Sequence, residues 1–280
     1  MYEDIFELVT IATQKKNLKE STAQAYCHTL NSFLNTIGKP WQELSIADVD
    51  DYLTAKRLAG IMPETYNHYY CALRFIYRWV LKLNWDEDEI PRMKRDHSLP
   101  TVLSRAEVNA ILDATTNLKY KAIFAVMYSA GLRVSEVTHL HYDDISRTNH
   151  SIHIRNTKNR MDRYAILSDR TLDILTEYWF KCGKPRNILF PSRATGEYLE
   201  INSINQALKR ITKRAGITKH VTSHAFRHSF ASHLWETGCD IKCIQALLGH
   251  LDPKSTEVYL HVSNKTLLGI KSPFDVQEDS

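Results

Sequence analysis

Apolar residues recur at helical spacing through most of this 280-residue chain, and one stretch alternates instead. Residues 151–155 and 163–167 each alternate apolar and other side chains with a period of two, and they flank a polar turn at 156–162. Such a pair predicts a β-hairpin, whereas repeats of three to four residues predict amphipathic helices. We therefore expect a mainly α fold of the α+β class, with a small antiparallel sheet of two or three strands.

The first part of the chain carries helical patterns only. Helices are predicted at 1–16, from an N-cap at Ser21, from a capping box at Ser45 and Asp48, and at 65–81 behind Pro63. Residues 86–100, DEDEIPRMKRDHSLP, contain two prolines and many charges, which is typical of a linker. The predicted organisation is a helical bundle at 1–86, a linker at 87–101, a second domain at 102–263 and a tail at 264–280.

The second part mixes helices with the hairpin. Ser104 and Glu107 have the spacing of a capping box, and an apolar, buried helix is expected at 120–129, ended by Gly131. Further helices are predicted from residue 132 and at 168–180, 201–215, 223–237 and 241–248. Gly238 and Gly249 are the expected helix ends.

Charge is divided unevenly between the two parts. Residues 1–98 contain 12 Lys and Arg against 14 Asp and Glu, a net charge of −2. Residues 99–280 contain 24 against 18, a net charge of +6, so the whole chain carries +4. A basic face suits a polyanion, although a solvated face with no partner has the same composition.

Targeting and metal signals are weak in this sequence. The N-terminus, MYEDIFELVT, is acidic where a signal peptide is basic, and no run approaches 18 apolar residues, so we expect a cytoplasmic protein without membrane spans. Cys239 and Cys243 share a helix face, but no second Cys or His pair completes a zinc site. We expect no metal and no cofactor.

The segment 222–262 carries most of the candidate chemistry. His224 and Arg227 begin a helical run, His250 follows Gly249, and Tyr259 comes nine residues later. An arginine holds a phosphate through paired hydrogen bonds, histidines move protons, and a tyrosine hydroxyl attacks phosphorus that is held in line. These residue types indicate chemistry on a phosphodiester.

Two upstream positions complete the set. Arg133 follows Gly131 among apolar neighbours, and a partly enclosed arginine needs an anion or a carboxylate. Glu136, three residues later on the same helix face, is placed to orient it. Lys158 lies in the hairpin turn, where a lysine taken alone is usually only solvent-facing.

Together these positions closely resemble the active site of the tyrosine recombinases, the phage-integrase family. The matching segments are GLRVSE at 131–136, HAFRHSFASHLWETG at 224–238, LLGH at 247–250 and STEVYLHV at 255–262. The resemblance extends over about residues 20–263 and implies that the first domain is a SAM-like core-binding domain. Order, spacing and flanking residues all agree.

The resemblance implies a role for each residue. Arg133 and Arg227 clamp the scissile phosphate, and Tyr259 attacks it to form a 3′-phosphotyrosyl bond and a free 5′-hydroxyl. Lys158 protonates the leaving oxygen, and His224 accepts the tyrosine proton. His250 donates to the phosphate, and Glu136 supports Arg133. The hairpin turn lacks the glycines usual in the family, so Arg160 stays open as an alternative to Lys158.

Double-stranded DNA with specific recombination sites is the expected partner. Contacts are predicted from the polar side of the helix at 65–81, with Asn67, His68, Arg74 and Arg78, and from Lys209, Arg210, Lys213 and Arg214. The family acts as tetramers on paired sites, so the resemblance also implies a homo-oligomer. The tail either docks into a neighbouring subunit or folds back on its own domain.

The function predicted is therefore site-specific DNA recombination, as integration, excision or resolution, with a mobile element preferred. A type IB topoisomerase-like enzyme is the alternative with the same chemistry. A non-catalytic helix-turn-helix regulator, built on residues 238–250, leaves the arginines and the tyrosine unexplained.

Overall fold

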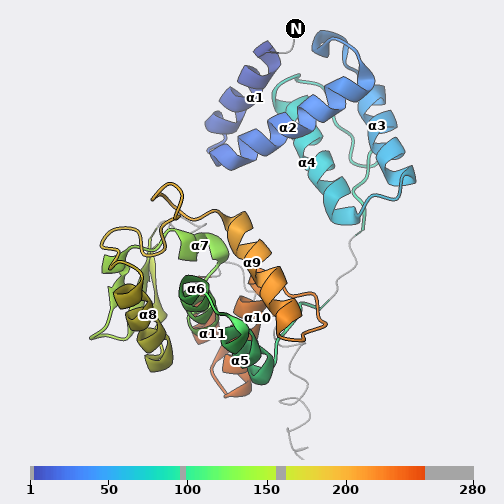
Figure 1. Cartoon of the computed structure of the whole chain (residues 1–280). Coiled ribbons are helices and arrows are strands. Elements are labelled where there is room, and N and C mark those ends of the chain that lie inside the picture. The colour runs from blue at the N-terminus through green and yellow to red at the C-terminus, as the bar shows by residue number, and fades with distance from the viewer. Residues whose placement is uncertain (1–2, 95–98, 156–161, 250–280) are drawn as a thin grey trace, which may run out of the picture. The chain divides into compact units, whose positions relative to one another are not determined.

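The computed structural model describes residues 3–94, 99–155 and 162–249. The chain divides into two compact units, Met1–His97 and Ser98–Ser280 (Figure 1). The described part contains helices throughout and one three-stranded antiparallel sheet, so the predicted α+β class is confirmed. The finer domain boundaries given above stay a prediction.

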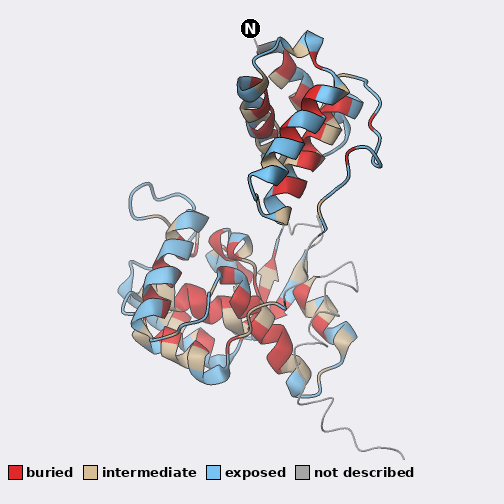
Figure 2. Ribbon diagram, turned by 90° about the vertical axis from the view of Figure 1, so that its right-hand side faces the viewer, coloured by how far each residue is buried: buried red, intermediate tan, exposed pale blue. Residues whose placement is uncertain are grey.

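The first unit is a bundle of four helices. They are α1 (Glu3–Lys15), α2 (Glu20–Ile37), α3 (Ile46–Leu58) and α4 (Pro63–Trp79), with a short 3-10 turn at Trp41–Glu43. Buried aromatic rings fill the centre, and Tyr70 and Tyr77 of α4 both meet the ring of Trp85 edge-on. Burial on one side of each helix, shown in red in Figure 2, follows the apolar stripes of the sequence.

Helix starts follow local capping chemistry, with one correction. The Ser45 hydroxyl accepts from the backbone N–H of Asp48, whose carboxylate accepts from that of Ser45, so the predicted capping box is confirmed. The Ser21 prediction is wrong, because the N-cap of α2 is Lys19, two residues earlier, and its side chain makes no capping hydrogen bond. An acidic residue in the first turn favours this start through the helix dipole.

The segment after α4 lies against the bundle. Ile90 is fully buried, and Asn67 on α4 exchanges two hydrogen bonds with the backbone of Met93. Asn67 is therefore buried, and its placement on the solvent side of α4 was wrong. The amide of Asn67 has both a donor and an acceptor, so it can pair with the N–H and the carbonyl of the same backbone residue.

The second unit is built around α6 (Leu118–Ser129), which is buried nearly all round as predicted. It packs against α5 (Arg105–Ala114), α7 (Val134–Thr138), α8 (Asp169–Lys181) and α10 (Ser223–Glu236). The remaining helices are α9 (Ile201–Arg214) and α11 (Ile241–Leu248), and a 3-10 turn lies at Tyr142–Asp144. The Ser104 and Glu107 capping box at the start of α5 is confirmed.

The sheet contains β1 (Ile145–Ser146), β2 (Ser151–Ile154) and β3 (Arg163–Ile166) in that order. The register pairs Ile152 with Ala165 and Ile154 with Arg163, so these residues share the face that turns to the core. The predicted hairpin is confirmed, and β1 extends it by a short third strand.

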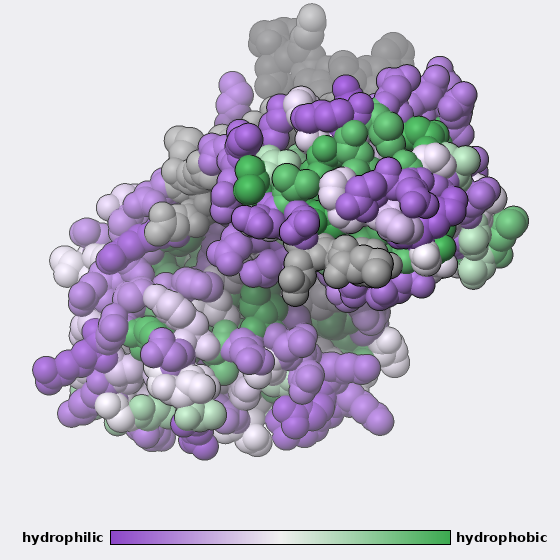
Figure 3. Space-filling model, turned by 90° about the horizontal axis from the view of Figure 1, so that it is seen from above, coloured by the Kyte–Doolittle hydropathy of each residue, from purple (hydrophilic) through white to green (hydrophobic). Residues whose placement is uncertain are grey.

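Surface composition adds one finding. Hydrophilic residues predominate on the face seen in Figure 3, with a large group of hydrophobic residues at the upper right and smaller groups elsewhere. No helix among the described residues is long and apolar enough to cross a membrane.

Candidate active site

A glycine turn leads the chain from α6 into the site. Gly131 has φ +62°, and a Cβ there would lie 2.8 Å from Cε1 of Phe230 and 2.9 Å from Cδ2 of Leu248. Both the left-handed backbone and the lack of space require glycine. The turn therefore places Arg133, the N-cap of α7, beside α10 and α11.

Glu136 joins the start of α7 to the Arg133 side chain. Its Oε2 accepts from the backbone N–H of Arg133 at 2.8 Å, and its Oε1 accepts from Nη1 of Arg133 at 2.8 Å. The Glu136 side chain is only 6% exposed. The predicted orienting contact between these two residues is therefore present.

Arg163, at the start of β3, is a further member of the site to which the sequence analysis assigned no role. Its Nη1 and Nη2 donate to Oε1 and Oε2 of Glu136, both at 2.9 Å, and its Nε donates to the carbonyl of Leu247 at 3.1 Å. A signal for it existed in the alternation of the strand, because residue 163 shares a face with the buried Ala165. A buried-face arginine requires an acidic partner.

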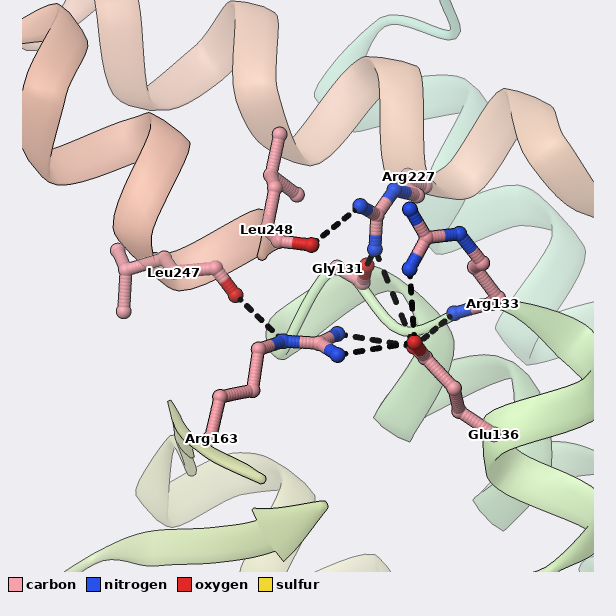
Figure 4. A network of polar contacts seen from close by, with 7 residues as sticks. All are labelled: Gly131, Arg133, Glu136, Arg163, Arg227, Leu247 and Leu248. Carbon is pink, nitrogen blue, oxygen red and sulfur yellow. Dashed lines mark hydrogen bonds and ion pairs between the residues drawn. The ribbon is translucent and has the colours of Figure 1, made fainter. Parts of the chain in front are cut away.

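Arg227 lies on α10 and is 3% exposed. Its Nη1 donates to the carbonyl of Gly131 at 2.7 Å, and its Nη2 donates to that of Leu248 at 2.5 Å. Its Nη1 also lies 3.9 Å from Oε2 of Glu136. Figure 4 shows the three guanidinium groups converging on this one carboxylate.

The cluster of Arg133, Glu136, Arg163 and Arg227, here called the arginine cluster, carries a net charge of +2. Burial alone would raise the pKa of Glu136, but the hydrogen bonds and charge of Arg163, with those of Arg133, lower it to about 2. Arginine stays protonated at all relevant pH values. The cluster is therefore a partly enclosed site with a surplus of positive charge, which suits an anion.

The histidines of α10 fall into two groups. His224 is exposed at the start of the helix and lines a cavity of about 790 Å³ together with Lys209 and Lys219. His228 is half-buried, and burial, with the positive charges of His224 and Arg227, lowers its pKa to about 4. His228 is therefore neutral near pH 7. His224 thus faces a space that admits a ligand, whereas His233, near the end of the helix, lines a different cavity and bonds to the Tyr128 hydroxyl.

Comparison with known proteins decides the family. Residues 101–266 match the sequence profile of the phage integrase family, and residues 5–87 match that of the phage integrase N-terminal SAM-like domain. The chain belongs to the phage integrase family. The predicted tyrosine recombinase, an enzyme of site-specific DNA recombination, is thereby confirmed, and the topoisomerase-like alternative is not favoured.

Related sequences agree along nearly the whole recombinase. It is 32% identical over 268 residues to a putative integrase/recombinase (y4qK) of Sinorhizobium fredii, covering 94% of this chain and 86% of the relative. It is 28% identical over 285 residues to tyrosine recombinase XerD of Oceanobacillus iheyensis, covering 95% and 94%. These relatives displace the non-catalytic regulator as an explanation.

Solved structures show the same fold. XerH recombinase bound to difH substrate aligns with a TM-score of 0.71 at 20% identity, over 95% of this chain and 84% of that one. XerA recombinase aligns with a TM-score of 0.58 at 23% identity, over 99% and 100%. The helical unit followed by a catalytic unit with a small sheet is thus shared architecture.

Several predicted site residues of the recombinase lie outside the described residues. These are Lys158, the alternative Arg160, His250 and Tyr259. The described residues end at Arg155 after β2, resume at Asp162 before β3, and end again at Gly249 after α11. The structure thus brings Arg133, Glu136 and Arg227 together and places His224 one turn before Arg227 on α10. The remaining assignments stay predictions.

The candidate DNA contacts on α9 differ in the contacts that they make within the protein. Lys209, Arg210 and Lys213 are exposed on α9, and Lys209 lines the cavity that also contains His224. Arg214, also exposed, donates to the carbonyl of Ala114. Of these four, Lys209 is the one that lines the cavity beside His224.

In the first unit, Arg74 and Arg78 line a small cavity of about 180 Å³ with Tyr26 and Trp79. Arg74 pairs with Glu87, whereas Arg78 is exposed. Arg78 is therefore the more available of the two predicted contacts.

The thiols show no metal site. Among the described residues, no group of three or more His, Cys, Asp or Glu side chains is arranged to hold a metal ion. Cys239 and Cys243 are free thiols at the start of α11.

Proposed function

We propose that this recombinase cuts and rejoins DNA at paired recombination sites through a 3′-phosphotyrosyl bond to Tyr259. The observation that supports the proposal best is the arginine cluster, with its net charge of +2. Val134, which follows Arg133 in the chain, lines the same cavity as His224. Arg133 and Arg227 bind the non-bridging oxygens of the scissile phosphate. Guanidinium groups match phosphate geometry with paired N–H donors.

Electrostatics explains why three arginines surround one glutamate. A phosphodiester carries one negative charge, and a second develops as a phenolate oxygen adds to phosphorus. The surplus of +2 thus matches the charge of the transition state better than that of the bound DNA. Preorganised positive charge of this kind lowers the barrier without any rearrangement at the moment of reaction.

In the proposed chemical step one bond to phosphorus forms, another breaks, and two protons are transferred. The Tyr259 oxygen forms a bond to phosphorus, the bond from phosphorus to the 5′-oxygen breaks, and that oxygen takes a proton from Lys158. His224 accepts the tyrosine proton, and His250 donates a hydrogen bond to the phosphate. A positioned acid is worth roughly two to four decades of rate here. Reversal with a different 5′-hydroxyl joins strands, and the covalent bond conserves the energy so that ATP is not needed.

Double-stranded DNA is the proposed substrate, bound largely through phosphates by Lys209, Arg210, Lys213 and Arg214 on α9 and by Arg74 and Arg78 on α4. In support, the XerH structure is a complex with difH substrate, and a lambda integrase dimer is bound to a core site. Two sites exchanged in one reaction require several active subunits, so we propose a tetramer on DNA. We propose that the tail at 264–280 docks into a neighbouring subunit of this tetramer. We also propose that the enzyme acts on DNA of a mobile element in the cytoplasm.

Covalent trapping tests the proposal. The substrate is a duplex built from sequence flanking the gene, with a nick beside each candidate cleavage position so that the cut strand diffuses away. A denaturing gel compares the wild type with Tyr259→Phe, and Tyr164→Phe is the matched control because Tyr164 is exposed on β3. We expect a DNA-linked band from the wild type and the control only.

The other outcomes are equally informative. A linked band that persists in Tyr259→Phe identifies another nucleophile, and mass spectrometry of the linked peptide then locates it. No band from wild type on a duplex that it demonstrably binds contradicts the proposed cleavage.

A further inference from the structure

Arg163 uses its whole guanidinium fork on two different segments. Two parallel bonds of 2.9 Å run to the two oxygens of Glu136, and the third, of 3.1 Å, runs to the Leu247 carbonyl at the end of α11. The side chain is 8% exposed. A side chain so engaged holds its partners in fixed relative positions.

The chain at the end of α11 also packs on the stem of Arg163. Gly249 has φ +64°, and a Cβ there would lie 2.9 Å from Cδ and 3.3 Å from Nε of Arg163. α11 and β3 are in contact along this edge. The backbone immediately before His250 is thus held against Arg163 by packing as well as by a hydrogen bond.

Three segments that lead to proposed reactive residues therefore meet at Arg163. One is the start of α7, with Arg133 and Glu136, and the second is the end of α11, which continues into His250. The third is Arg163's own strand, which follows the hairpin turn that contains Lys158. These segments are far apart in the sequence, since Leu247 lies 84 residues from Arg163.

We infer that Arg163 is a positioning residue for strand cleavage, which holds the start of α7, with Arg133 and Glu136, against β3 and the end of α11. The inference rests on the proposed function and deepens it. Arg163 acts through Glu136 and the Leu247 carbonyl and does not itself bind the phosphate. Small misplacements of reactive groups slow a reaction about 100-fold without abolishing binding.

The geometry requires arginine at this position. A lysine has one ammonium and bonds either Glu136 or the Leu247 carbonyl well, whereas the planar fork of arginine bonds both. Loss of the Arg163 charge also affects Glu136, which then keeps, among the described residues, the ion pairs with Arg133 at the start of its own helix and with Arg227 from α10. Burial then acts with less opposition, so the pKa of Glu136 rises.

Single-turnover cleavage of the trapping duplex tests the inference. The variants are Arg163→Met, Arg163→Lys and the double variant Glu136→Gln/Arg163→Met. Arg155→Met is the matched control, because Arg155 follows directly after β2 of the same hairpin. Its side chain is 49% exposed and pairs with Asp144, which lies outside the cluster. Gel shift measures DNA binding, and circular dichroism measures folding.

We expect Arg163→Met to cleave about 100-fold more slowly than Arg155→Met while it binds DNA nearly as well. Arg163→Lys should be intermediate. On acidification, cleavage by Arg163→Met should fall more steeply than cleavage by the wild type, because the pKa of Glu136 is higher when Arg163 is absent. The double variant lacks this carboxyl, so its rate should not show that additional fall.

The contrary results are distinct. Cleavage by Arg163→Met at the rate of Arg155→Met overturns the inference, as does a double variant whose rate falls on acidification as steeply as that of Arg163→Met. If Arg163→Met fails to fold, Arg163→Lys decides, since a folded lysine variant at the wild-type rate contradicts a positioning role. Failure of the proposed function shows differently, as no Tyr259-dependent band from the wild type.

Discussion

Replacement of Glu136 by glutamine should destabilise the second unit by about 3 kcal/mol at pH 7. The pKa of this carboxyl falls from an ordinary 4.5 to about 2, because the hydrogen bonds and charges of Arg163 and Arg133 outweigh burial. At 1.36 kcal/mol per tenfold change in proton affinity, the fall corresponds to about 3 kcal/mol. Breaking a buried ion pair on one side typically costs about 3–5 kcal/mol, which agrees in size.

The sign of the pH dependence follows from the lowered pKa. The stabilisation by Glu136 is fully present above the unfolded pKa near 4.5 and disappears as the pH falls through the folded pKa of about 2. About 2 kcal/mol of it should be lost between pH 7 and pH 3. The gap between wild type and Glu136→Gln should therefore narrow on acidification.

Urea unfolding, monitored by hydrogen exchange of peptides from α6, measures this difference in stability. Helix α6 is chosen because it belongs to the second unit only. Glu177→Gln is the control, since Glu177 pairs with Lys181 on the exposed face of α8. If Glu136→Gln is as stable as Glu177→Gln at pH 7, or if its deficit is unchanged at pH 3, the electrostatic account of the cluster is refuted.

Three further predictions concern single positions. Gly131→Ala should cost about 2–4 kcal/mol of stability and slow cleavage, because its Cβ enters the space of Phe230 at a left-handed backbone position; normal melting would contradict this. Ser104→Ala should cost about 1 kcal/mol through loss of the capping box with Glu107, measured by urea unfolding of α5. Lys209→Ala should weaken binding to all duplexes and reduce the slope of log affinity against log salt by about one, measured by fluorescence anisotropy. An unchanged slope would remove Lys209 from the phosphate contacts.

Local signals predicted most of the elements. Ser45 and Ser104 were identified as helix starts because capping depends on residues within three positions of each other. The hairpin was predicted because its alternation is also local. Ser21 was wrongly predicted as an N-cap because α2 begins at Glu20 without any side-chain cap, so the start carries no capping residue to recognise. Asn67 was misplaced because its partner, Met93, lies 26 residues away.

By itself, the sequence determined the fold class, the family and the candidate residues Arg133, Glu136, His224 and Arg227, since each belongs to a short motif whose spacing is local. Only the tertiary structure decided which guanidinium groups share Glu136. Arg163 reaches it across 27 residues and reaches the Leu247 carbonyl across 84. Hydrogen bonds between distant segments depend on how the helices and the sheet pack, and periodicity within one segment carries no information about that packing.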